Sequence, residues 1–172
     1  LFLGLYSCQV KKNEVVINGK INGEIPVHVE YSIPIDGISY AGFRNVVIPD
    51  SLGNFEITVP ISKPSILHIL IIHQAHGRLV VEPGKRYYVE YNLEQEDKKF
   101  IVTGENQIGQ NEFNSLPSRH VQISAKNFLN DTIVDDIEQS IKTSLKNEVS
   151  QFNEYLNSGK ISSDFYELVQ LD

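Results

Sequence analysis

The sequence predicts a mainly β protein with C-terminal helices, in which an antiparallel β-sandwich is followed by a helical linker segment. Two observations carry this prediction. Up to residue 104, short apolar or alternating runs are separated by turns rich in Gly, Pro, Asn and Asp, a pattern typical of several short antiparallel strands. After Pro117, apolar residues recur at intervals of three and four, which is the period of an amphipathic helix.

The expected strands are short, and turn residues separate them. Residues 27–33 alternate between apolar and polar, which predicts a half-buried strand, whereas the near-continuous apolar run 66–72 predicts a strand buried on both faces. Residues 50–54 are rich in turn formers and lie between β-branched runs, so they predict a hairpin. Further strands are expected at 15–17, 46–48, 55–59, 78–82, 87–92 and 100–104.

The helical part of the chain is predicted from an apolar stripe. Its members are Val134, Ile137, Ile141, Leu145, Val149, Phe152 and Leu156. Residues 130–132 supply caps at its start, and residues 157–159 end it at a glycine. Ser162 and Ser163 are expected to cap a second helix, whose apolar pattern continues to Asp172. We expect both ends of the full-length protein to lie outside this chain.

Cys8 is the only cysteine, and it follows a short apolar run that ends in a small residue. Lipoprotein signal peptides place Leu or a similar residue three positions before the lipidated cysteine and a small residue directly before it. Leu5 and Ser7 fit this pattern, although Tyr6 is bulkier than usual. The alternative is a buried structural cysteine, because free Cys packs as a small hydrophobe. The polar residues after Cys8 favour lipidation.

A lipid on Cys8 would tether the protein to a membrane without spanning it. The expected location is the cell envelope. By resemblance to other lipoproteins, the basic rather than acidic residues after the cysteine, Lys11 and Lys12, imply the periplasmic side rather than the cell surface. No apolar run approaches the roughly 20 residues that a spanning helix needs. A single cysteine forms neither an internal disulfide nor a C-x-x-C pair, so these residues alone cannot be a dithiol oxidoreductase.

Composition and length set the domain organisation. The 172 residues are 41% hydrophobic and 22% charged, as in a folded globular protein, and the net charge of −7 argues against nucleic acid as a partner. We divide the chain into a signal-peptide remnant with the lipidated cysteine (1–8), a sandwich domain (9–116) and a helical segment (117–172), which we expect to be a truncated linker to a further domain.

The order of the turn motifs resembles a known module. The motifs are Ile21-Asn22-Gly23, Asp50-Ser51-Leu52-Gly53-Asn54-Phe55, Val81-Glu82-Pro83-Gly84, Val102-Thr103-Gly104, Asn106 and Gly109-Gln110. Over roughly residues 17–116 the chain is similar to the N-terminal β-sandwich domain of Bacteroidetes-type thioredoxin-like (thiol:disulfide interchange) lipoproteins. The resemblance implies that the helices lead to a thioredoxin-fold domain with C-x-x-C, a domain that this chain does not contain.

His73 and His76 are weak candidates for metal ligands, because they form H-x-x-H at a predicted hairpin tip. A metal site needs three or four convergent ligands, and a turn does not guarantee that two imidazoles converge. Exposed turn histidines are therefore the favoured interpretation, and no metal or other cofactor is expected. No G-x-S-x-G, Walker or G-x-G-x-x-G pattern occurs, so no catalytic residue is assigned.

Three tyrosines on one expected strand form a possible binding surface. Period 2 places Tyr87 and Tyr91 on one face and Tyr88 on the other. Exposed aromatic residues on a sheet can stack on sugar rings or build a protein interface. Core packing or a half-buried position is the favoured explanation, however, and the absence of tryptophan makes a carbohydrate-binding face less attractive. A glycan site requires Tyr87 or Tyr88 to be exposed beside a groove with convergent polar side chains.

These observations favour a non-catalytic scaffold or interaction domain of an envelope lipoprotein. By resemblance, it would be accessory to a downstream thioredoxin-like oxidoreductase domain. It would hold that domain off the membrane, orient it, or contribute to the docking of partners. The alternative is a glycan- or nutrient-binding module of an envelope lipoprotein. A self-contained hydrolase has the least support, and these 172 residues are not expected to be an enzyme.

Overall fold

A computed structural model describes residues 10–35, 44–95, 99–116 and 149–171. The chain divides into two compact units, residues 1–105 and residues 106–172. The first is a β-unit and the second is helical. The division places helix α1 (Gln107–Ser115) with the helical unit, whereas the division predicted from the sequence placed these residues in the sandwich region 9–116.

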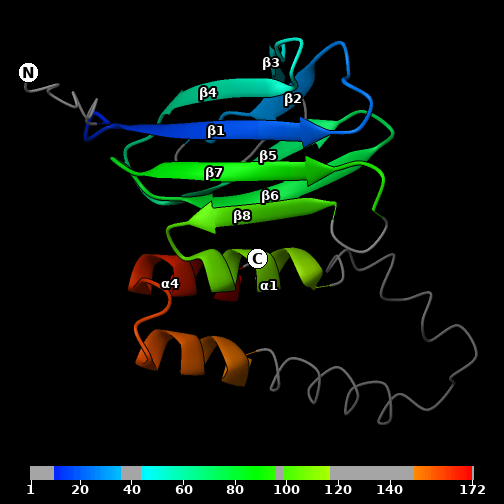
Figure 1. The fold of residues 1–172 in the computed structure, drawn as a ribbon. Helices are drawn as coiled ribbons and strands as arrows, with labels where there is room; N and C mark the ends of the chain where they lie inside the picture. Colours follow the sequence, from blue (N-terminus) through cyan, green and yellow to red (C-terminus); the bar gives the residue numbers. More distant parts are fainter. Residues whose placement is uncertain (1–9, 36–43, 96–98, 117–148, 172) are drawn as a thin grey trace, which may run out of the picture. The chain divides into compact units, whose positions relative to one another are not determined.

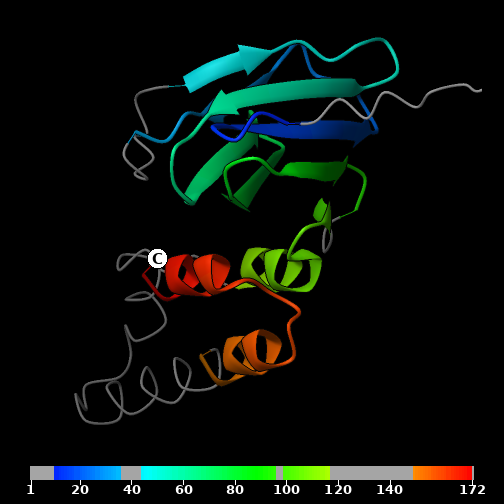
Figure 2. The same cartoon turned by 90° about the vertical axis from the view of Figure 1, so that its left-hand side faces the viewer.

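The β-unit contains two four-stranded sheets (Figures 1 and 2). The first sheet has the order β4-β1-β7-β8, built from β1 (Glu14–Asn22), β4 (Asn54–Pro60), β7 (Arg86–Asn92) and β8 (Phe100–Gly104). The second sheet has the order β3-β2-β5-β6, built from β2 (Val29–Ser32), β3 (Arg44–Val47), β5 (Ser65–Ile71) and β6 (Ala75–Val81). Two sheets followed by helices confirm the predicted fold class.

Strands β1 and β7 run parallel, with Ile17 opposite Tyr87. The other pairings among the described strands are antiparallel, as predicted. The exception has a topological cause. A turn at Pro83-Gly84 takes the chain from β6 in the second sheet to β7 in the first, so no hairpin sets the direction of β7 against its neighbour β1.

The predicted hairpin at residues 50–54 is wrong, although the turn itself is present. Asp50 Oδ1 accepts hydrogen bonds from the backbone N–H groups of Leu52 at 2.9 Å and Asn54 at 2.8 Å, and Gly53 has a φ of 82°. Strand β3 pairs with β2, however, while β4 pairs with β1. The turn therefore carries the chain from one sheet to the other, because a tight turn fixes the local reversal but not the pairing partner.

Strand β5 is buried on one face only, which corrects the prediction from its apolar run. Leu67, Ile69 and Ile71 point into the core with at most 1% exposure, whereas the side chains between them are half-buried. Apolar residues on the outward face of a sheet are common, because a protein surface carries much apolar area.

The core lies between the two sheets, and two aromatic rings pack directly against glycines. A Cβ atom at Gly19 would lie 1.9 Å from Cζ of Phe55, which is its cross-strand partner. A Cβ atom at Gly77 would lie 2.5 Å from Cε2 of Phe100. Since no side chain fits at either position, the rings of Phe55 and Phe100 occupy the space above these glycines.

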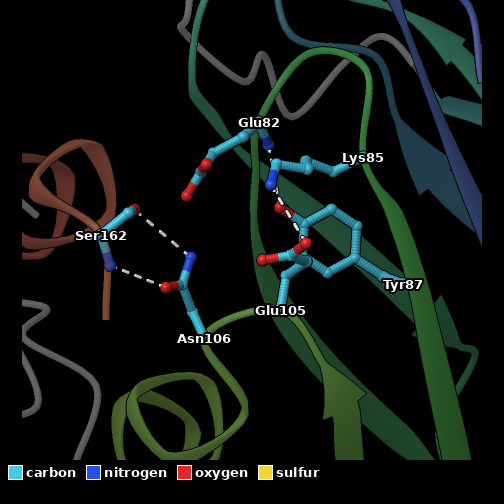
Figure 3. Close-up of polar contacts among 6 residues, drawn as sticks. All are labelled: Glu82, Lys85, Tyr87, Glu105, Asn106 and Ser162. Carbon is cyan, nitrogen blue, oxygen red and sulfur yellow. Dashed lines mark hydrogen bonds and ion pairs between the residues drawn. The ribbon is translucent and has the colours of Figure 1, made fainter. Parts of the chain in front are cut away.

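Two buried tyrosines of β7 connect the sheets through hydrogen bonds. Tyr91 donates from its hydroxyl to the carbonyl of Ile69, on β5 of the second sheet, at 2.8 Å. The hydroxyl of Tyr87 accepts from the backbone N–H of Glu82, directly after β6, at 3.0 Å (Figure 3). Both tyrosines are 0% exposed, so these bonds satisfy phenol groups that would otherwise be buried without a partner.

The described part of the helical unit comprises α1, a helix at residues 149–157 and α4 (Ser163–Leu171). Ser162 Oγ accepts a hydrogen bond from the N–H of Phe165 at 3.0 Å, which confirms the predicted cap of the last helix. Asn106, before α1, accepts from the N–H of Ser162 at 2.7 Å (Figure 3). A Cβ atom at Gly109 would lie 2.5 Å from Ile161 Cγ2, so α1 packs closely on the chain before α4.

The apolar stripe predicted for this unit is described only at its end. Phe152 is 3% exposed and packs against Phe165 with ring centroids 6.3 Å apart. The earlier stripe residues, 134–145, and the predicted caps at 130–132 lie outside the described residues. Among the helices that the structure describes, none has the length and apolar character needed to cross a membrane.

Replacing Tyr91 by Phe removes the hydroxyl that donates to Ile69 and leaves a buried carbonyl with one partner fewer. We expect the free energy of unfolding to fall by about 1 kcal/mol, the usual net value of one hydrogen bond. Tyr88→Phe is the matched control, because its hydroxyl is on the exposed face, and it should change stability by less than about 0.5 kcal/mol. Chemical denaturation of both variants measures the difference, and equal stabilities would contradict the role of Tyr91.

Candidate binding face and histidine pair

The outward face of the first sheet is a polar surface with one aromatic ring. Along β7, inward residues are buried, and the outward ones include Tyr88 and Glu90. Register places Asn18 of β1 and Thr103 of β8 on either side of Tyr88. One row further along, Lys20 of β1 lies beside Glu90. The alternation of the strands therefore gathers polar side chains from several strands around a single tyrosine.

Tyr88 is 52% exposed and borders a hollow of about 370 Å³. The hollow is lined by Asn18, Gly19, Lys20, Asn54, Phe55, Tyr88, Val89, Glu90 and Thr103. Since Gly19, Phe55 and Val89 belong to the inward-facing positions of their strands, these residues contribute backbone to its floor. The other lining residues carry amide, hydroxyl, ammonium and carboxylate groups, together with the phenol ring of Tyr88.

Hydrogen bonds between neighbouring strands hold the polar groups of this face in place. Asn18 donates from Nδ2 to Glu56 Oε2 at 2.9 Å and accepts at Oδ1 from Arg86 Nη1 at 2.7 Å. The same Arg86 nitrogen lies 3.5 Å from Glu56 Oε2, which closes a three-residue network. Asn22 donates to both Glu90 and Asn92. Of the residues that line the hollow, Asn18 and Glu90 are therefore held by side-chain bonds to neighbouring strands.

Of the three tyrosines predicted as a binding surface, only Tyr88 is available. Tyr87 and Tyr91 are 0% exposed and lie on the inner face, which corrects that part of the prediction. Their face also carries Val89, whereas the face of Tyr88 carries charged Glu90, and the apolar face is the one that turns toward the second sheet. Burial raises the pKa of both hydroxyls, so they stay protonated.

A second hollow, of about 300 Å³, is more apolar. Its walls include Ile25, Val27 and Ile72, which are 39%, 85% and 42% exposed. His28 and Gln74 are its neighbours on the polar side. It has no tyrosine, and its polar lining residues are Glu24, His28 and Gln74, fewer than those of the hollow beside Tyr88, so it is the weaker candidate for recognising a polar ligand.

The two histidines predicted as weak metal candidates do not meet each other. His73 is exposed in the turn between β5 and β6, with a φ of 61°. His76 lies on β6 and faces His68 of β5 instead, with 2.9 Å between His68 Nδ1 and His76 Nε2. His68 was not predicted as a candidate, because it lies inside a strand that was expected to be buried on both faces. Only the register of β5 against β6 reveals the pair.

The surroundings of this histidine pair are positively charged. Partial burial, followed by the charges of His68, Arg78 and Arg44, lowers the pKa of His76 from 6.5 to about 4. Arg44 also donates to Glu30 Oε2 at 2.7 Å, and this bond lowers the pKa of Glu30. Within the described part of the chain, no group of three or more His, Cys, Asp or Glu side chains is arranged to hold a metal ion.

Cys8, the predicted lipidation site, lies outside the described residues. Among the residues that are described, every buried side-chain nitrogen and oxygen atom has a hydrogen-bond partner. The described core therefore shows no buried polar side-chain atom without a partner, and we look for a binding site among the exposed groups of the outward faces.

Comparisons with known proteins give little further guidance. No family model matches the chain, and no curated protein sequence matches it. A crystal structure of a "putative cell adhesion protein" from Bacteroides fragilis is similar over 54% of this chain and 45% of that protein's chain, with a TM-score of 0.30 and 6% sequence identity. A similarity this low carries no argument about function.

The depressed pKa of His76 makes stability depend on pH. Between pH 6.5 and about 4, the unfolded chain binds a proton at His76 that the folded chain does not bind. The free energy of unfolding should therefore decrease as the pH falls through this window. We expect an NMR titration of the His76 ring to give a midpoint near 4, and His76→Gln to flatten the pH dependence of denaturation. A midpoint near 6.5 would contradict the predicted effect of burial and the surrounding charges.

Proposed function

We propose that this chain is a non-catalytic interaction module of an envelope lipoprotein, and that the β-unit binds its ligand on the outward face of the first sheet, at the hollow beside Tyr88. The observation that carries the proposal is the exposed Tyr88 ring amid ordered polar side chains from neighbouring strands. A pocket that combines an aromatic surface with a few well-placed polar groups is the usual form of a small-ligand site.

The chemistry of this hollow favours a neutral glycan as the ligand. A phenol ring can stack on the apolar face of a sugar ring. Asn18 keeps one N–H and one lone pair beyond its bonds to Glu56 and Arg86. The Asn54 amide nitrogen donates to Asp50, so Asn54 offers its carbonyl oxygen. Lys20 keeps donors beyond its bond to the Leu52 carbonyl, and Glu90 offers acceptors, so the set suits hydroxyl groups that donate and accept. The opposite charges of Lys20 and Glu90 are neighbours on the sheet, so the hollow does not select strongly for either sign of ligand charge.

The size of the hollow agrees with a ligand of one or two sugar rings. Small-molecule sites range from about 300 to 1,000 Å³, and the hollow of about 370 Å³ lies near the lower limit. Glu56 and Glu90 are each already bonded to an asparagine amide. In such an arrangement the carboxylates serve as fixed acceptors, which supports recognition of a ligand without a chemical step.

We also propose the role implied by the resemblance, in which the module is accessory to a downstream thioredoxin-like domain. The turn motifs that carry the resemblance have structural roles here: Gly53 and Gly84 adopt left-handed conformations at turns that connect the sheets, and Phe55 fills the space above Gly19. Glycan binding and the accessory role are compatible, because a binding module could localise an oxidoreductase near its substrates.

Removing the ring of Tyr88 tests the glycan proposal. We expect a panel of neutral oligosaccharides to contain a ligand for the wild-type chain, and Tyr88→Ala to weaken its affinity by roughly tenfold or more, because loss of an aromatic contact costs about 0.5–1.5 kcal/mol beyond the lost area. Tyr88→Phe keeps the stacking surface and should retain most of the affinity. Isothermal titration calorimetry measures both.

Two outcomes would contradict the glycan proposal. One is a panel in which no neutral glycan binds. The other is a ligand whose affinity is the same for wild type and Tyr88→Ala, because such a ligand would bind elsewhere. Unfolding of the variants should match the wild type, since Tyr88 is on the exposed face, so a loss of binding would not reflect a loss of fold.

The envelope-lipoprotein role is tested on the full-length gene. We expect the wild-type product to fractionate with membranes and Cys8→Ser to release it, because the lipid is the proposed anchor. The gene beyond codon 172 should encode a domain with C-x-x-C. Membrane association that survives Cys8→Ser would overturn the lipid anchor, and a downstream domain without paired cysteines would overturn the redox role.

A further inference from the structure

Strand β4 is an edge of the first sheet, and among the described strands it pairs with β1 alone (Figure 1). In an antiparallel pair, bonded and non-bonded positions alternate along each strand. The Ile21 N–H donates to the Gly53 carbonyl at 2.9 Å, and the Ile61 N–H donates to the Asn13 carbonyl at 3.0 Å. Gly53 and Ile61 lie directly before and after β4. The odd-numbered residues of β4 therefore bond to β1, and the backbone groups of the even-numbered ones face away from it.

The free edge of β4 offers complete pairs of backbone groups at its centre. Glu56 and Thr58 are exposed, and each directs an N–H and a C=O group away from β1. At one end, the Asn54 N–H donates to Asp50 Oδ1 and the Asn54 carbonyl accepts from the Asp50 N–H, both at 2.8 Å. At the other end, Pro60 has no N–H. The centre of the edge is therefore a template for one short added strand.

We propose that two copies of this chain associate through these edges, antiparallel and with Ile57 opposite Ile57, so that their first sheets form one continuous sheet. Each Glu56 then lies opposite Thr58 of the second copy, and the two residues exchange both of their backbone hydrogen bonds. The two such pairs use all the free backbone groups of Glu56 and Thr58 in both copies. Addition of a strand at a sheet edge is a common mode of protein recognition, and pairing of a strand with its own copy has the two-fold symmetry of most homodimers.

The neighbouring registers are poorer. If Glu56 lay opposite Glu56, like charges would face each other, and Thr58 would meet Asn54, whose backbone groups are already bonded. If Thr58 lay opposite Thr58, Glu56 would meet Pro60, which has no N–H to donate to the Glu56 carbonyl. The register centred on Ile57 avoids both defects, so the edge is complementary to itself.

The side chains of the edge suit the same register. Glu56 Oε2 accepts from Asn18 at 2.9 Å and lies 3.5 Å from Arg86 Nη1, which leaves Oε1 to accept from the Thr58 hydroxyl of the second copy. Cross-strand pairs of this kind contribute to the stability of a sheet. The inward apolar side chains of β4 are at most 5% exposed in the single chain. Association therefore adds little apolar burial, and we expect a weak dimer that forms as the concentration rises.

The dimer brings two candidate binding hollows onto one surface. Opposite residues of neighbouring strands point to the same face of a sheet, so the outward faces of the two first sheets are continuous. From β7 of one copy to β7 of the other there are five strand spacings of about 4.8 Å, which places the two Tyr88 positions roughly 24 Å apart across the strands. If glycan binding is as proposed above, on which this one consequence rests, a longer glycan occupies both hollows and binds more tightly than to a single copy.

Sedimentation of the full chain measures self-association, under reducing conditions that prevent a disulfide between two copies of Cys8. We expect dimers to form between micromolar and millimolar concentrations, because a few backbone bonds exceed the cost of association by little. Thr58→Pro should weaken the dimer by at least about tenfold, since it removes one donor from each copy. The Thr58 N–H faces away from β1, so this variant should keep its fold.

Two charged variants test the register without proline. Thr58→Glu places a carboxylate opposite Glu56 and should weaken the dimer several-fold at low salt, whereas Thr58→Lys places an ammonium group there and should strengthen it several-fold. Thr103→Glu and Thr103→Lys are matched controls on β8, the other edge of the same sheet, and should leave the dimer unchanged. Thermal unfolding checks that all the variants fold.

Hydrogen exchange tests the same edge without any variant. The amides of Glu56 and Thr58 should exchange fast at low concentration and become protected as the concentration rises. The amide of Ile57 is bonded to β1 in the single chain, so it should be protected at every concentration.

Three results would overturn the proposal. The first is a chain that stays monomeric up to millimolar concentration. The second is a dimer that Thr58→Pro and Thr58→Glu leave intact, or that the Thr103 variants weaken instead, because its interface would lie elsewhere. The third is equal weakening by Thr58→Glu and Thr58→Lys, which contradicts the pairing of Thr58 with Glu56. None of these measurements uses a glycan, so they are independent of the outcome at the Tyr88 hollow.

Discussion

The hydrogen bond from the Tyr91 hydroxyl to the carbonyl of Ile69 constrains how the two sheets are placed against each other, while burial of the apolar core supplies most of the stability. It joins the first sheet to the second across a core in which both residues are fully withdrawn from water. A buried hydroxyl without a partner costs about 1–3 kcal/mol, so the bond forms only when β7 and β5 have the observed spacing and register. A one-residue slip of β7 would also exchange Tyr88 with its buried neighbours. The strand register that places Tyr91 inward therefore also places Tyr88 on the outward face.

The core between the sheets also depends on the close packing of aromatic rings against glycines. Phe55 lies over Gly19, and Phe100 lies over Gly77 and contacts Tyr91 with ring centroids 4.9 Å apart. Glycine weakens a strand when it stands alone, because it offers no side chain to pack. Here the rings provide the missing surface. The Phe100–Tyr91 contact also places the ring of Tyr91 so that its hydroxyl reaches Ile69, which links core packing to the bond between the sheets.

Much of the fold could be predicted from local sequence, and the parts that could not depend on long-range pairing. The alternation along β7 correctly placed Tyr88 on the opposite face from Tyr87 and Tyr91. Apolar Val89 on one face and charged Glu90 on the other indicated which face is buried. The turn at residues 50–54 was predicted, but the hairpin was not formed, because β3 and β4 find partners in different sheets. His68 and His76 are eight residues apart and meet only through the register of β5 and β6. No short window of sequence contains that register.

The outward face of the first sheet has side-chain hydrogen bonds that contribute little to the stability of the fold. Exposed ion pairs and hydrogen bonds contribute about 0–1 kcal/mol each, far less than the burial of the apolar residues between the sheets. Asn18 nevertheless bonds to both Glu56 and Arg86, and Asn22 bonds to both Glu90 and Asn92. Such networks fix the directions of polar groups before a ligand arrives, and pre-organisation of this kind reduces the entropy that binding must overcome. The inward residues thus determine the fold, while outward residues of the first sheet are linked by side-chain bonds that the core does not require.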